Sequence, residues 1–162
     1  MTTLIEQDAL IVIAEVSVAI AGFAGIIAAV NKPRDSFARI AFINVVFVAV
    51  GVVLQSLLPI LLAFSGLRDE WVWRVASAVF VLGVVIAYIA NRNEIVQSTE
   101  GHRSEWVFIA ADVIVALWLA GAVLGHPAPN YSFVYLGALY WYLVVSFRYF
   151  FVSISSLRAG DN

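Results

Sequence analysis

The chain has 162 residues, of which 63% are hydrophobic and only 12% are charged. A soluble domain carries about 25% charged residues, so this composition excludes an ordinary water-exposed surface and predicts one that faces lipid. The formal net charge of −2 and the scattered basic residues exclude a nucleic-acid footprint, and the lack of cysteine excludes disulfides and thiolate sites.

The first predicted element covers about 9–30, an apolar run long enough to span a bilayer. Its flank, MTTLIEQD, has no basic residue, unlike the start of a signal peptide, so we expect a helix that is retained. Asn31, Lys32 and Pro33 follow it. Because proline disfavours helical geometry in the preceding residue, we expect the helix to end there.

Four further apolar runs predict helices over about 37–64, 71–90, 106–124 and 131–154. Trp71 and Trp73 are typical of an interfacial aromatic belt. Residues 91–105 are polar and predict the longest connection, and Asn130 can cap the last helix. The fold class is therefore all-α: one polytopic membrane domain, 1–162, with about five transmembrane helices and four as the alternative.

The basic residues of the loops predict the orientation, because Lys and Arg gather on the cytoplasmic side. One set of loops and the tail carries most of them: Lys32, Arg34, Arg39, Arg92, Arg103 and Arg158. The opposite side carries only Arg68 and Arg74. We therefore expect the N-terminus outside and the C-terminus in the cytoplasm, with a bacterial inner membrane as the location.

Glu15 lies inside the first apolar run, where a charged side chain costs about 2.5–3.5 kcal/mol on insertion scales. Small residues share or border its helical face and predict a surface on which another helix packs closely, within the chain or between subunits. They are Ala19, Gly22, Gly25 and Ala29.

Depth along the helices suggests partners for Glu15, since each residue adds about 1.5 Å. Glu15 lies about 9 Å and Gln55 about 13 Å from the predicted outer ends of their helices. An amide can donate a hydrogen bond to a carboxylate. Arg74, near the start of the third helix, is a second candidate partner. Together with Asn44, Glu15 and Gln55 form a candidate ion pathway.

Asp112 and Arg148 are the other deep charges. Each lies six residues from the predicted cytoplasmic end of its helix, so an ion pair between the fourth and fifth helices is predicted. A structural role in fixing the helix register is the simplest interpretation. Asn44 could join the pair.

No catalytic or nucleotide-binding motif is present, and the two histidines lie in different loops, so we expect neither an enzyme nor a metal or cofactor. The leading hypothesis is a homo-oligomer in which the first helix lines or borders a pathway for a cation or a proton, with Glu15 repeated around the axis. The alternative is a non-conducting structural or regulatory subunit that binds another membrane protein or lipid.

Overall fold

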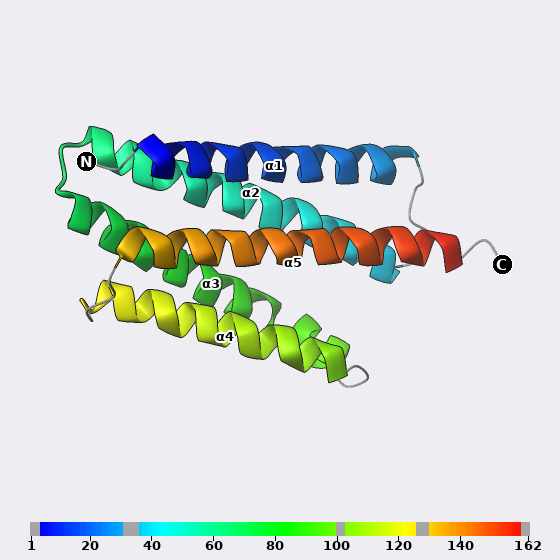
Figure 1. Cartoon of the computed structure of the whole chain (residues 1–162). Coiled ribbons are helices and arrows are strands. Elements are labelled where there is room, and N and C mark those ends of the chain that lie inside the picture. The colour runs from blue at the N-terminus through cyan, green and yellow to red at the C-terminus, as the bar shows by residue number, and fades with distance from the viewer. Residues whose placement is uncertain (1–3, 31–35, 100–102, 126–129, 160–162) are drawn as a thin grey trace. The chain divides into compact units, whose positions relative to one another are not determined.

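The computed structural model describes residues 4–30, 36–99, 103–125 and 130–159. Within these ranges the chain forms five α-helices: α1 (Leu4–Val30), α2 (Ser36–Phe64), α3 (Asp69–Thr99), α4 (Arg103–Val123) and α5 (Tyr131–Ala159) (Figure 1). Each of them contains a stretch long and apolar enough to cross a membrane. The predicted all-α, polytopic fold is confirmed, and the protein is a multi-pass membrane protein.

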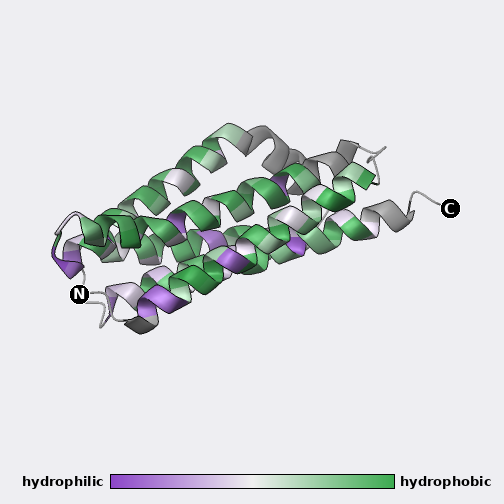
Figure 2. Ribbon diagram, turned by 90° about the horizontal axis from the view of Figure 1, so that it is seen from above, coloured by the Kyte–Doolittle hydropathy of each residue, from purple (hydrophilic) through white to green (hydrophobic). Residues whose placement is uncertain are grey.

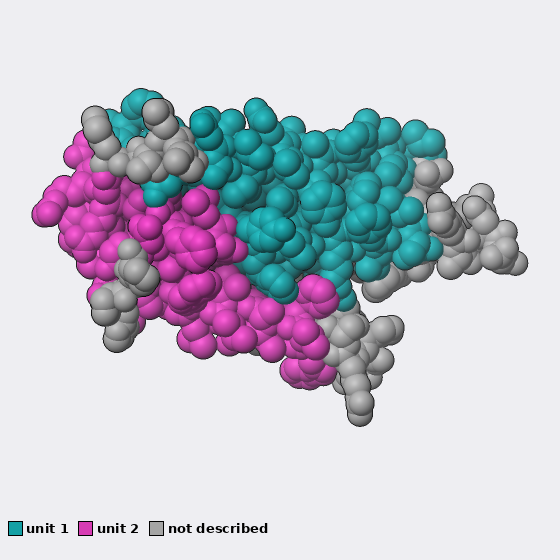
Figure 3. All heavy atoms as spheres, in the orientation of Figure 1, with its two compact units in different colours: residues 1–65, 139–162 teal, residues 66–138 magenta. Residues whose placement is uncertain are grey.

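The helices divide into two compact units (Figure 3). The first unit contains residues 1–65 and 139–162, so it holds α1, α2 and most of α5. The second contains residues 66–138, with α3, α4 and the start of α5. The α5 helix therefore contributes side chains to both units.

The first unit is held together by apolar side chains from three helices. Helices α1 and α2 pack side by side. Their shared core is a cluster of buried residues to which α5 adds a leucine: Ile20, Ala24, Phe42, Val45 and Leu143. Tyr149 and Phe150 of α5 pack against the same cluster, so the middle of α5 is anchored on α1 and α2.

The second unit is organised around Tyr135 near the start of α5. Its side chain is fully buried, and its ring centroid lies 5.7 Å from those of Trp73 and Phe80 on α3. Tilted and edge-on pairs of this kind add to the stability that burial provides. The belt position predicted for Trp73 is thus wrong, since its side chain is only 5% exposed, whereas Trp71 is half exposed.

Two helices end just before a glycine in the left-handed conformation. Gly66, after α2, and Gly125, after α4, have φ angles of +78° and +75°. Glycine adopts this left-handed conformation without the steric cost that a Cβ atom brings, and it commonly terminates helices. At the start of α5 the carbonyl of Asn130 accepts a hydrogen bond from the Val134 N–H, as expected for the residue that precedes a helix.

Helix α3 is longer than predicted. It continues to Thr99 rather than ending near Ala90, so much of the predicted polar connection 91–105 is helical. The physical reason is that residues 91–99 contain no glycine or proline to stop the helix, and backbone hydrogen bonding can continue once the chain has left the apolar run.

Hydrophobic residues predominate along the helices (Figure 2). Large hydrophobic side chains are exposed on all five helices, for example Phe23, Phe47, Leu82, Leu117 and Phe133. An apolar patch of this extent would be unstable in water. It fits contact with the hydrocarbon of a bilayer.

Five membrane crossings would place the two termini on opposite sides of the membrane, and the loop charges predict the N-terminus outside. Because the chain has no cysteine, single cysteines report topology directly. In intact cells Ser65→Cys, in the loop after α2, should react with an impermeant maleimide, and Ser155→Cys should react only after permeabilisation. The reverse labelling pattern would show that the N-terminus lies in the cytoplasm and the C-terminus outside.

Candidate functional site

Helix α1 has one buried face. Its buried residues recur every three or four positions: Leu10, Ala14, Ser17, Ile20 and Ala24. This spacing is that of a single helical stripe, and its inner members Ile20 and Ala24 belong to the core shared with α2. The Ser17 hydroxyl donates to the Ile13 carbonyl at 2.8 Å, so this polar group is satisfied within the helix.

Glu15 lies on the opposite face of α1 and is exposed. The small residues predicted to form a packing face are exposed too: Ala19, Gly22, Gly25 and Ala29. A Cβ atom placed on Gly22 or Gly25 would meet nothing within 4 Å. The core shared with α2 involves the buried stripe of α1, whereas the small-residue face is exposed and has room for a further helix.

The position of Glu15 along α1 makes its exposure costly. The membrane-spanning stretch runs from Glu6 to Val30, so Glu15 lies three residues from its middle, about 4.5 Å along the axis. A carboxylate this deep cannot reach the aqueous interface as the long side chains of Lys or Arg do. Among the described residues it has no hydrogen bond or ion pair. A charged carboxylate at this depth is stable only where protein or water covers it.

Asp8 is a second acid on the same face, and it was missed because α1 was expected to begin near residue 9. The helix begins by Leu4, and Asp8 is exposed. Seven residues separate Asp8 from Glu15, almost two full turns, so both carboxylates lie on one side about 10.5 Å apart along the axis. The spacing of seven in the sequence was the available signal.

Gln55 and Asn44 are both half-buried on α2. The predicted hydrogen bond between Gln55 and Glu15 is absent among the described residues, and Gln55 has interactions of its own. Pro59 lies inside α2 and is fully buried. Since proline lacks an N–H, the Gln55 carbonyl receives no helical hydrogen bond from position 59. A role for Gln55 and Asn44 in a pathway stays a prediction.

Asp112 and Arg148 belong to different units, and their ion pair stays a prediction. In the second unit the Tyr88 hydroxyl donates to Asp112 Oδ2 at 3.2 Å, which ties α3 to α4. In the first unit the Arg148 guanidinium lies 5.9 Å from the centre of the Tyr149 ring, close enough for a cation–π contact. Sequence depth did not indicate the Tyr88 contact.

Arg74 has a carboxylate partner on its own helix. Its Nη2 lies 2.5 Å from Oε1 of Glu70, one turn earlier on α3. The guanidinium also lies 5.6 Å from the ring centres of Trp71 and Tyr131, and it donates a hydrogen bond to the Tyr131 side chain. These contacts make Arg74 a link between α3 and the start of α5 within the second unit.

Gly125 completes this cluster. A Cβ atom built at Gly125 would lie only 2.7 Å from Arg74 Nη2. The glycine is therefore needed for its left-handed backbone, and a Cβ atom there would also make the end of the flexible Arg74 side chain shift. The Arg74 cluster, made of Glu70, Trp71, Arg74, Gly125 and Tyr131, fits a structural role at one end of the second unit.

Comparison with protein-family models, with curated proteins and with solved structures found no match to this chain. The fold and the site therefore assign the protein to a structural class, and no family is assigned. The protein is a small helical integral membrane protein with an acidic, small-residue face on α1.

Proposed function

We propose that the protein is a homo-oligomer in which the exposed face of α1 borders a pathway for a cation or a proton. The observation that carries the proposal is Glu15, exposed near the middle of a membrane-spanning helix and without a partner among the described residues. Packing of α1 faces from several copies would remove the carboxylate from lipid. The small side chains beside it would allow the helices to approach closely.

The two acids on this face support a pathway rather than a packing contact alone. Asp8 lies near the start of the span and Glu15 near its middle, on one side of the helix. Copies of α1 around an axis would repeat both carboxylates as two rings at different depths. Rings of acids select cations and raise their local concentration.

The second candidate is a non-conducting structural or regulatory subunit, in a different class of function. The exposed α1 face favours it as well, since the same small residues could receive a helix of another membrane protein. Under this alternative Glu15 would donate or accept a hydrogen bond across the interface. Its replacement would weaken assembly and leave ion flux unchanged.

Flux through the purified protein in liposomes separates the two candidates, with wild type compared to Glu15→Gln. We further propose that the protein is not an enzyme and that it resides in a bacterial inner membrane. Helical spans support that location, because transmembrane proteins of the bacterial outer membrane are typically β-barrels.

A further inference from the structure

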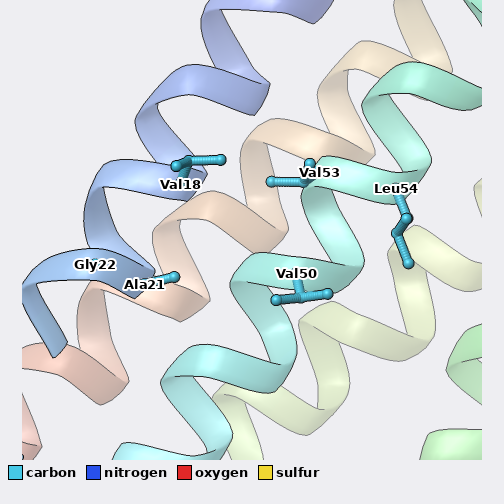
Figure 4. Close-up of a pocket in the computed structure, with 6 residues that line it drawn as sticks. All are labelled: Val18, Ala21, Gly22, Val50, Val53 and Leu54. Carbon is cyan, nitrogen blue, oxygen red and sulfur yellow. The ribbon is translucent and has the colours of Figure 1, made fainter. Parts of the chain in front are cut away.

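An open groove lies between α1 and α2 in the first unit (Figure 4). It has a volume of about 420 Å³ and is lined by apolar residues of both helices: Val18, Ala21, Gly22, Val50, Val53 and Leu54. Gly22 forms part of the wall without a side chain, and a Cβ atom placed on it would meet nothing within 4 Å. The groove therefore has room for a large apolar side chain that comes from outside the unit.

Phe23 is a large side chain at the depth of this groove. It is the only aromatic residue of α1, and it is 62% exposed. It follows Gly22 directly, so the two residues differ by only about 1.5 Å along the helix axis. Successive residues point about 100° apart around a helix, so Phe23 lies on another flank of α1 and does not line the groove of its own copy.

Phe47 on α2 is exposed as well, but it lies on the groove's own side of that helix. It precedes Leu54, a residue of the groove wall, by seven residues, which is almost two full turns. Phe47 therefore borders the groove, whereas Phe23 lies on a flank that can meet the groove of a different copy.

Equal depth is the condition that a ring of copies must meet. All copies of a membrane protein insert in one orientation, so the rotation axis of a cyclic oligomer runs along the membrane normal and equivalent residues lie at one depth. A contact between two different surfaces of the same chain is heterologous, and it forms a ring when the rotation closes. Phe23 and the groove lie at the same level of α1, so they satisfy this condition.

Glu15 lies between these two flanks of α1. At about 100° per residue, Glu15 is about 80° from Phe23 in one direction around the helix and about 60° from Val18 in the other. Contacts through both flanks would leave the Glu15 side of each α1 turned toward the centre of the ring. The carboxylate itself takes no part in the contact.

We infer that Phe23 of one copy packs into the α1–α2 groove of the next copy, so that the copies form a closed ring. The inference rests on the proposed function, because the pathway there requires several copies, and it names the surfaces through which they meet. Helices in hydrocarbon associate through close van der Waals packing rather than through the hydrophobic effect. A phenylalanine ring seated beside the bare backbone of Gly22 provides such packing.

Photo-crosslinking in nanodiscs tests this contact. Replacing Phe23 by p-benzoylphenylalanine keeps an aromatic ring at the position and makes it photoreactive. Irradiation should join copies into dimers and larger species, and mass spectrometry should place the links on Val50, Val53 or Leu54 of another copy. The same replacement at Phe133 is the control, because Phe133 is as exposed as Phe23 but lies two residues from the start of its span, at a different depth. It should give no link to the groove.

Filling the groove provides a second measurement. In the protein photoreactive at position 23, Gly22→Leu should lower the yield of linked copies at least about fivefold, because overpacking disfavours a contact by that factor or more. Gly137→Leu is the matched control, since Gly137 is also an exposed helical glycine with nothing within 4 Å of its Cβ position. It should leave the yield unchanged.

Three results would overturn the inference: links from position 23 to lipid alone, links to another copy outside the groove, or an equal yield with and without Gly22→Leu. The first of these would show that an acyl chain fills the groove. The proposed function is tested separately by flux. Glu15-dependent flux without links to the groove would overturn only the inference, and links to the groove without Glu15-dependent flux would overturn only the proposed pathway.

Discussion

Replacing Glu15 by glutamine should reduce cation or proton flux at least about tenfold. Glutamine has nearly the same shape, so packing of α1 should be kept while the negative charge is lost. A carboxylate attracts a cation 4 Å away by about 4 kcal/mol at the effective dielectric constant typical near protein surfaces. Tenfold corresponds to only about 1.4 kcal/mol. The measurement is flux of K⁺ and of protons into liposomes that contain the purified protein.

Two further variants sharpen this result. Glu15→Asp keeps the charge and should retain most of the flux. Asp8→Asn should reduce flux less than Glu15→Gln, because Asp8 lies near the start of the span, where water screens its charge. Equal flux in wild type and Glu15→Gln, or flux in neither, would contradict the pathway and favour the non-conducting subunit.

Replacing Gly125 by alanine should lower the stability of the folded protein more than any other glycine-to-alanine change at the described helix ends. A Cβ atom at φ +75° costs about 1–2 kcal/mol. It would also lie 2.7 Å from Arg74 Nη2, so the guanidinium must shift from its position beside Glu70 and Tyr131. Weakening of these contacts adds to the backbone cost. Thermal unfolding in detergent, followed by circular dichroism, measures the effect.

Gly66→Ala is the matched control for this prediction. Gly66 has nearly the same φ, +78°, but nothing lies within 4 Å of its Cβ position. It should therefore show the backbone cost alone. Equal destabilisation by the two substitutions would mean that the approach of Arg74 to Gly125 contributes nothing.

The fold was predictable because the membrane imposes a simple rule. A span needs about 20 apolar residues, and five such runs are visible in the sequence. The rule says little about polar residues beyond the hydrocarbon, which is why α3 was expected to end near Ala90 and α1 to begin near residue 9. Both helices continue into polar sequence that contains no glycine or proline.

The site was predictable in part. Glu15 stood out because a carboxylate in hydrocarbon is costly, and its small neighbours stood out because they allow another helix to pack closely. Depth alone suggested Gln55 as a partner but could not show on which side of α1 the core lies, and Glu15 lies on the face opposite the buried stripe of that helix. The approach of Arg74 to Gly125 depends on contacts between residues about fifty positions apart, which no local pattern in the sequence reports.

The central claim is that the Glu15 face of α1 meets the same face in other copies of the chain. Pulsed electron resonance on spin labels attached to Ala19→Cys in nanodiscs measures this directly. Ile114→Cys is the control, since Ile114 is exposed near the middle of the α4 span. We predict an interspin distance between copies that is shorter for the label at 19 than for the label at 114. No dipolar signal at either site, or a longer distance at 19, would contradict the claim.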